Sequence, residues 1–446
     1  MRKSRRFLTA PVSTSRMPPG IPYIIGNEAA ERFSYYGMSG ILTVFMSTYL
    51  RDRTGHLAVM SESSASAWYH IFASANYFFP LFGAILADAF WGRYHTIFWL
   101  SLVYCCGHAA LAIDDTRTGL VVGLSLIAIG AGGIKPSVSA MVGDQFGPDN
   151  SHLVPRAFGW FYAAVNCGST VSFLLIPWLL DRFGSHVAFG VPGLLMLVAT
   201  LVIWVGRYRF THVPPAGKAY LSAVLGAAGR KIVLRLALVF GFTAVFWALW
   251  SQSLSEWIEQ ATHMNLHFAG ITWLAPQLGV LNAAMILALI PLFRVGIYPA
   301  IDRVFPLNPL RKIGLGLLAA GAALLVSAWI ESRIARGLTP SIGWQLPAYF
   351  ILSAAEVLVS ITSLEFAYTQ APRIMKSAIM ALYLLSISGG HLIAAAVHLL
   401  GLRGPNYYLF YSAMAVVACL LFIPFARRYR EHSYLQDDSS AHAPVT

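Results

Sequence analysis

The sequence predicts an all-α, polytopic membrane protein whose twelve transmembrane helices form two six-helix halves. Of its 446 residues, 57% are hydrophobic and only 11% are charged, whereas a soluble domain carries roughly a quarter charged residues. Apolar windows of about 20 residues, the length that crosses the hydrocarbon core of a bilayer, recur along the whole chain. A basic connection over residues 207–231 separates the first six windows from the last six.

Each half is predicted to run through its spans with short connections. We expect the twelve spans near residues 21–50, 64–87, 95–113, 118–142, 158–180, 187–206, 232–256, 272–293, 311–330, 344–368, 377–400 and 405–426. The predicted regions are therefore an N-terminal tail (1–20), a first half (21–206), a linker (207–231), a second half (232–426) and a C-terminal tail (427–446). The linker is too short to hold two further spans.

The distribution of Lys and Arg predicts the orientation. Of the 31 basic residues, 22 lie on the side that holds both tails and seven on the other side, while Arg32 and Lys135 lie within spans. Because cytoplasmic loops carry an excess of Lys and Arg, both termini are expected to be cytoplasmic. The net charge of +12 then reflects topology, and no basic patch on a soluble face indicates nucleic-acid binding.

Neither a metal site nor a disulfide is expected. The four cysteines all fall in apolar spans, without the spacing of ligands or bridges, so they are interpreted as small packing residues. The chain also has no Asn-x-Ser/Thr sequon, which favours a bacterial inner membrane as its location.

The first predicted span contains two acids and a base, Glu28, Glu31 and Arg32. Ionisable groups inside a membrane span are costly and usually functional. Helical spacing places Glu28 and Arg32 one turn apart. An acid held beside a base can lose and regain a proton as its surroundings change, which is the chemistry of a proton-coupled carrier. A neutral ion pair that only orients the helix is the alternative.

The loop between the second and third spans, Gly83-Ala-Ile-Leu-Ala-Asp88-Ala-Phe-Trp-Gly92-Arg93, resembles the loop signature of the major facilitator superfamily. That resemblance implies two six-helix halves with a substrate site between them at mid-membrane. The glycines allow a tight turn, and Asp88 is expected to cap a helix end or to pair with a base.

Five further motifs resemble the proton-dependent oligopeptide transporters, the peptide-transporter branch of the major facilitators. They are Glu28-x-x-Glu31-Arg32-Phe33-x-Tyr35-Tyr36-Gly37, Gly132-Gly-Ile-Lys135-Pro with Gly-Asp144-Gln-Phe, Phe161-Tyr162-x-x-x-Asn166, Phe246-Trp247-Ala-Leu-x-x-Gln252, and Glu356-x-x-x-Ser-x-x-x-Leu-Glu365-Phe. The similarity runs from about Ile21 to the last span. It implies symport of di- and tripeptides with protons, driven by the proton gradient without a cofactor.

The resemblance also implies roles for single residues. Arg32 and Lys135 would hold the peptide carboxylate, and Glu356, Asn166 and Asn282 its amino group. The side-chain pockets would be lined by Tyr36, Tyr69, Tyr162, Phe246, Trp247 and Tyr383. A zwitterionic backbone needs a cationic and an anionic end in a low-dielectric cleft, and aromatic walls accept varied side chains, so these residue types suit the task.

Lys135 comes from the first half and Glu356 from the second, so a salt bridge between them would close one side of the cleft. A peptide or proton that competes for either partner would shift the equilibrium between the two faces. The alternative is a static pair that stabilises the bundle.

His70 completes the set of expected proton-coupling residues, with Glu28, Glu31 and Arg32. The Tyr69-His70 pair resembles the mammalian intestinal and renal peptide transporters, and histidine titrates near operating pH. A histidine that only bonds a carbonyl is the alternative. His108, His391 and His398 lack such context and are expected to be packing or headgroup residues.

The chain departs from the family pattern at several positions. Ser39 and Ser251 stand where many members have an arginine and an acid. In the family, this arginine and acid can form a salt bridge that acts as a gate between the halves. Because both charges are absent here, neither leaves a buried partner unpaired. We therefore expect neutral contacts to hold this gate and carboxylate binding to rely more on Arg32 and Lys135. Tyr383 replaces a frequent tryptophan, and Gly390-His391 replaces a frequent Gly-Asn.

These departures leave two other functions open beside peptide symport. One is a transporter, or exporter, of a peptide-like natural product, an amino acid or nitrate. The other is a membrane scaffold or sensor that no longer transports, which the buried ionisable set argues against. An enzyme is not expected, because no metal cluster, phosphate loop or nucleophile–base set is found. The expected partners are small peptides, protons and the lipid bilayer, with the protein acting as a monomer.

Overall fold

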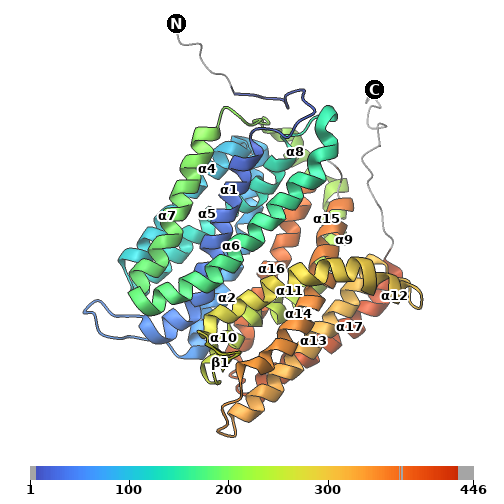
Figure 1. Ribbon diagram of the computed structural model, residues 1–446. Coiled ribbons are helices and arrows are strands. Elements are labelled where there is room, and N and C mark those ends of the chain that lie inside the picture. The colour runs from blue at the N-terminus through green and yellow to red at the C-terminus, as the bar shows by residue number, and fades with distance from the viewer. Residues whose placement is uncertain (1–6, 371, 373–374, 430–446) are drawn as a thin grey trace.

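The computed structural model describes residues 7–370, 372 and 375–429 as a bundle of helices (Figure 1). Residues 1–6 of the predicted N-terminal tail and 430–446 of the C-terminal tail lie outside the described residues. Helix α1 begins near the top of Figure 1, and helix α17 ends at the right of the picture, near α12. We refer to the end of each half at which α1 begins or α17 ends as the terminal end and to the other as the distal end.

The N-terminal half contains six membrane-length segments. They are α1 (Ile21–Val44) with η1 (Phe45–Tyr49); α2 (Glu62–Phe78), α3 (Pro80–Ile85) and η2 (Leu86–Trp91); α4 (Arg93–Ile113); α5 (Arg117–Gly143); α6 (Val154–Phe183) after the short η3 (Pro148–Leu153); and α7 (Ser185–Gly206). The linker holds one short helix, α8 (Lys218–Leu225).

The C-terminal half repeats this arrangement with more interruptions. Its segments are α9 (Ala227–Trp250), η4 (Ser251–Leu254) and α10 (Glu256–Thr262); η5 (Ala275–Gly279), α11 (Val280–Leu292), η6 (Phe293–Ile297) and α12 (Tyr298–Asp302); α13 (Pro309–Ile334); η7 (Ile342–Trp344), α14 (Gln345–Glu356), η8 (Val357–Ile361) and α15 (Thr362–Thr369); α16 (Lys376–Leu399); and α17 (Pro405–Arg428). An antiparallel hairpin of β1 (His267–Phe268) and β2 (Ile271–Thr272) follows α10.

The predicted fold class is confirmed. Within the described residues, eleven helical segments are long and apolar enough to cross a membrane. Helix α1, which has 24 residues and carries the three charges of the first span, completes the twelve. The predicted end of the linker differs, because α9 already begins at Ala227. The apolar window of this span begins after Arg230 and Lys231. The helix includes both residues, because long basic side chains can reach the membrane surface from a helix end.

Contacts between the halves come from a few helices. Within the halves, α4 packs against α5 and α1 against α6, and their counterparts in the second half, α13 with α14 and α9 with α16, also pack together. Across the halves, α2 packs along α16, α6 contacts α11, and α1 contacts α10. This arrangement places residues of α2 beside residues of α16, more than 300 positions later in the sequence.

Glycines in the second and fourth spans permit a close helix contact. A Cβ atom on Gly83 of α3 would overlap the backbone carbonyl of Gly132 of α5. Gly92, between η2 and α4, has φ +77°, a conformation that side chains with a Cβ rarely adopt. The motif glycines therefore set the spacing of α3 and α5 and the turn into α4.

Replacing Gly83 by Ala should lower the thermal stability of the detergent-solubilised protein. Overpacking a tight contact costs about 1–3 kcal/mol, because the methyl group has to displace a backbone carbonyl. Gly241→Ala is the matched control, since a Cβ there meets no atom within 4 Å. Equal melting temperatures for the two variants would show that α3 and α5 are free to separate.

The predicted pairing of Asp88 is confirmed at the terminal end. Arg93 lies 3.3 Å from Asp88 and also forms an ion pair with Asp144, just beyond α5. Burial raises the pKa of the Asp144 carboxyl, and the Arg93 guanidinium acts against that rise. One arginine thereby joins the ends of the second, third and fourth spans.

Candidate functional site

The charges of α1 form one buried cluster. The Nε atom of Arg32 lies 2.7 Å from Glu28 Oε1 and 2.9 Å from Glu31 Oε2. The carboxylate side chains are 4% and 0% exposed and the arginine side chain 12%. The sequence prediction of contact between these residues is thus correct. Because two acids share a single guanidinium, the cluster has one acid in excess and can hold a proton without breaking the remaining ion pair.

Lys135 of α5 lies next to this cluster without a hydrogen-bond partner among the described residues. Its Nζ atom instead stands 3.9 Å from the ring centre of Tyr35 and 4.3 Å from that of Tyr77. Faces of aromatic rings attract a cation through their quadrupole. The ammonium group is therefore held in place while its three hydrogen-bond donors remain available to an anion.

Glu356, at the end of α14, is fixed by two donors from its own half. Trp250 Nε1 donates to its Oε2 at 2.6 Å, and Asn282 Nδ2 donates to the same atom at 2.9 Å. Asn282 also donates to Ser353 Oγ at 3.1 Å. The Oε1 atom has no hydrogen bond within the described chain. The carboxylate is thus oriented with one oxygen left for a cation.

The predicted salt bridge between Lys135 and Glu356 is not formed in this conformation. The reason is that each group has other partners: two tyrosine rings for Lys135, and Trp250 and Asn282 for Glu356. Sequence reasoning missed Trp250, although it stands one turn after Trp247 in the seventh-span motif, where its ring faces the same side.

Other predicted site residues from both halves lie around Glu356. Tyr36 and Tyr162, from the first half, and Tyr383, from the second, are within electrostatic range of its carboxylate. Asn166 donates from Nδ2 to the backbone oxygen of Tyr162 at 2.9 Å. The structure therefore brings residues of both halves near Glu356.

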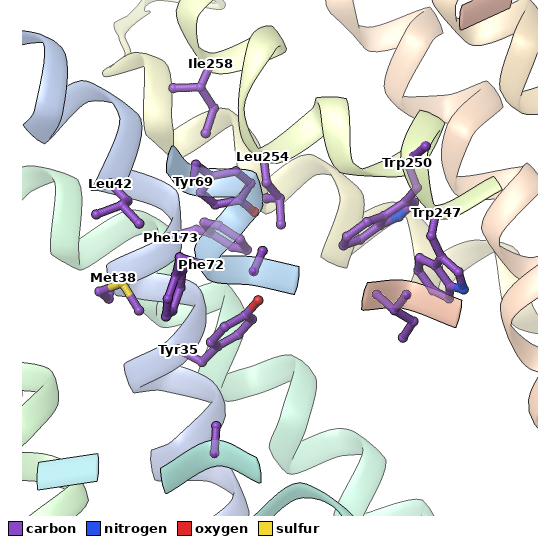
Figure 2. Close-up of a cluster of buried hydrophobic side chains, with 14 of the residues drawn as sticks. Tyr35, Met38, Leu42, Tyr69, Phe72, Phe173, Trp247, Trp250, Leu254 and Ile258 are labelled. Carbon is purple, nitrogen blue, oxygen red and sulfur yellow. The ribbon is translucent and has the colours of Figure 1, made fainter. Parts of the chain in front are cut away.

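Some predicted pocket residues are packed into the core instead. Tyr69 and Phe246 have no exposed surface, and Trp247 and Tyr383 are each 5% exposed. Figure 2 shows Tyr69 beside Leu254 in the buried cluster, with Trp247 to one side. In this conformation these aromatics support the walls of the site from behind rather than lining an open pocket.

His70 bonds across the halves. Its Nδ1 atom lies 3.1 Å from Nδ1 of His391, and its Nε2 atom lies 3.2 Å from Ser255 Oγ. The ring of His398 stacks on that of His70 with centres 5.6 Å apart. The expectation that His391 and His398 are packing or headgroup residues did not include these contacts with His70. No local motif could have shown this, because only the pairing of α2 with α16 brings them to His70.

The polar contacts between the halves lie at mid-membrane and toward the distal end. Ser74 and Ser388 share a hydrogen bond at 2.9 Å in the middle of the bundle. Nearer the distal end, Ser47 donates to Glu259 at 3.5 Å. There, too, Glu62 lies 3.1 Å from His263. These contacts hold the two halves together in this conformation.

Ser39 and Ser251 do not bond each other. Ser39 is fully buried, and the hydroxyl group of Ser251 donates within its own helix, to the backbone oxygen of Ala248 at 2.9 Å. The expectation that neutral contacts hold this gate stays a prediction.

A cavity of about 720 Å³ opens at the distal end, where none of the predicted site residues lines it. Its charged and titratable lining residues are Glu62, Glu256, Glu259, Glu331, His263, His398 and Arg403. No local sequence pattern indicates this cavity, because its acids come from three different helices, α2, α10 and α13.

This chain is similar to a known protein family and to several curated proteins. The family model described as "POT family" matches residues 94–228 and 222–410. Among curated proteins, the chain is 36% identical over 378 residues to peptide transporter family 1 of Drosophila melanogaster, covering 72% of this chain and 49% of that protein. It is 32% identical over 398 residues to solute carrier family 15 member 2 of Homo sapiens, covering 78% and 54%. The chain thus spans about half the length of these curated relatives.

Solved structures match the fold over nearly the whole chain. A crystal structure of an auto-inhibited POT family peptide transporter has a TM-score of 0.84 and 33% identity, covering 96% of this chain and 99% of that one. The POT family transporter PepTSo has a TM-score of 0.83 and 35% identity, covering 92% and 98%. The relatives of this chain are transporters and not enzymes. The chain is a multi-pass membrane protein that belongs to the POT family.

Proposed function

We propose that this protein imports di- and tripeptides together with protons by alternating access. The observation that carries the proposal is the fixed carboxylate of Glu356, in the half opposite Arg32 and Lys135. Among the described residues, one oxygen of Glu356 and the ammonium group of Lys135 have no hydrogen-bond partner. A zwitterionic peptide backbone has the matching ends, an ammonium and a carboxylate, and charge-assisted bonds to it are strong in a low-dielectric site.

In the proposed binding mode, the peptide lies between the halves. Its ammonium group contacts Glu356, with Asn166 and Asn282 as amide partners, and its carboxylate contacts Lys135 and Arg32. The peptide side chains meet the aromatic residues Tyr36, Tyr69, Tyr162, Phe246, Trp247 and Tyr383. For the buried members of this set, contact requires the halves to move apart from their present packing.

Proton coupling is proposed to use the excess acid of the α1 cluster together with His70. Protonation of Glu28 or Glu31 frees Arg32 from one carboxylate, so that Arg32 can turn to the peptide. When the peptide leaves, a direct Lys135–Glu356 bridge can form and close the empty site for the return movement. No cofactor is needed, because the proton gradient supplies the driving force, and the protein acts as a monomer.

The proposed location is a bacterial inner membrane with both termini in the cytoplasm. The Lys and Arg bias of the loops supports this orientation. The terminal end of the bundle then faces the cytoplasm, and the distal end, with its acidic cavity, faces outward.

A second candidate keeps the fold and changes the cargo to a peptide-like natural product, an amino acid or nitrate. It is motivated by Ser39 and Ser251, which leave both ends of a frequent family charge pair neutral. Such a change alters the polarity near the site without removing Glu356 or Lys135.

Uptake of labelled dialanine into proteoliposomes tests the proposal. We expect accumulation with an inside-alkaline pH gradient and only background uptake without it. Unlabelled tripeptides should compete, whereas nitrate and single amino acids should not. Competition by one of the latter alone would favour the second candidate, and absence of any uptake by well-folded protein would overturn peptide symport.

A further inference from the structure

Three histidines lie in a row where the halves meet. His391 and His398 are seven residues apart on α16 and so share one face of the helix. His70 of α2 lies against both, with ring centres 5.4 Å from His391 and 5.6 Å from His398. All three are almost completely buried. Buried histidines that contact one another across a moving interface need an explanation beyond packing.

The outer end of this row reaches the acidic cavity. Nε2 of His398 lies 3.4 Å from Glu256 Oε1 and 3.2 Å from the hydroxyl oxygen of Tyr407. Glu256, His398 and Tyr407 all line the cavity, and the side chain of Glu256 is 20% exposed. Because the acids of the cavity outnumber its one arginine, the cavity concentrates cations, including hydronium, near Glu256.

The inner end of the row reaches Lys135. The ring of His391 is nearly parallel to that of Tyr77, at 8° and with centres 6.1 Å apart. Tyr77 is one of the two rings that hold the Lys135 ammonium group. Lys135 in turn is within electrostatic range of Glu28 and Glu31. The row of histidines therefore connects the distal cavity with the charged cluster of α1.

We propose that Glu256, His398 and His391 extend His70 into a relay that carries protons from the distal acidic cavity to the Lys135 and α1 cluster. The inference rests on the proposed function, proton-driven symport, and assigns the path by which the proton arrives.

The hydrogen bond between His70 and His391 determines how a proton passes from one ring to the other. Only one hydrogen fits between the two Nδ1 atoms, so one ring donates and the other accepts. A proton arriving at Nε2 of His70 makes that ring an imidazolium. Its Nδ1 proton then crosses to Nδ1 of His391, which releases its own Nε2 proton inward. His70 is left neutral with its proton on Nε2, and the movement of α2 away from α16 resets both rings.

One gap lies between His398 and His70, whose rings stack without a hydrogen bond among the described residues. The Ser255 hydroxyl, which bonds His70 Nε2 and precedes Glu256 in the chain, or a water molecule has to carry the proton there. At the inner end, the positive charge of Lys135 opposes a lasting imidazolium at His391. The tyrosines that face the row, Tyr69, Tyr77 and Tyr407, stay neutral at the operating pH.

The relay is tested with His391→Asn, His398→Gln and Glu256→Gln in proteoliposomes. We expect each to lower gradient-driven dialanine uptake about 100-fold, the lower end of the range for a lost proton-transfer group, and to flatten its dependence on external pH. Counterflow exchange, which needs no net proton movement, should stay within about twofold. His108→Asn is the matched control, a buried histidine of α4 outside the row.

The outcomes separate the relay from the proposed function. Wild-type uptake and pH profile in all three folded variants would overturn the relay and leave symport intact. Equal loss of uptake and counterflow would show a structural role and also overturn it. Absence of uptake by the wild type would instead count against peptide symport.

If the wild type takes up no dialanine, the relay can still be tested without a transported peptide. Nitrogen NMR of ¹⁵N-histidine-labelled protein should show His70 and His391 titrating as a coupled pair. In the His391→Asn variant, the pH at which the His70 signals change should shift, and the change should occur in one step instead of two. An identical His70 titration in wild type and variant would overturn the shared proton.

Discussion

Uptake of dialanine should fall at least about tenfold when Glu356 is replaced by Gln. A hydrogen bond to a charged group contributes about 1.5–3 kcal/mol, and each 1.4 kcal/mol corresponds to a factor of ten in affinity. The amide keeps the shape of the side chain but removes the charge that an ammonium group needs. Trp250 Nε1 and Asn282 Nδ2 would still find an acceptor in the new oxygen, so the fold should tolerate the change.

The measurement is the concentration dependence of uptake and of counterflow, both of which require binding. Glu365→Gln is the matched control, an exposed carboxylate two turns further along the same span. Trp250→Phe should give an intermediate loss, because it removes one donor and keeps the ring. Unchanged uptake in Glu356→Gln would show that the ammonium group of the cargo binds elsewhere, or that the cargo has none.

The sequence predicted the parts of this protein that depend on local pattern. Apolar windows gave the twelve spans, and helical spacing gave the contact of Glu28 with Arg32. The ends of the spans were less accurate, as at Ala227, because a hydropathy window stops at the first basic residues while the helix continues through them.

Contacts between helices that are distant in the sequence could not be predicted in the same way. The bond of His70 to His391, the donor from Trp250 to Glu356 and the rings around Lys135 all depend on how distant helices pack. The predicted Lys135–Glu356 bridge shows the related difficulty that a transporter has several conformations. A motif can indicate which residues belong to a site, but it does not say which partner each residue has in a given state.

Gradient-driven accumulation should be abolished when Glu31, or Glu28, is replaced by Gln, whereas counterflow should remain. Both acids contact the same nitrogen of Arg32, so either substitution leaves one acid with one base. A balanced buried pair has no spare group to take up a proton, because the remaining carboxylate stays ionised beside the guanidinium. Arg32 itself is retained, so the peptide carboxylate can still bind.

Accumulation and counterflow in the same proteoliposome preparations measure this difference. Asp181→Asn, an exposed acid at the distal end of α6, controls for the loss of an acid as such. Equal loss of both activities would show that Glu28 and Glu31 serve folding or binding and not coupling.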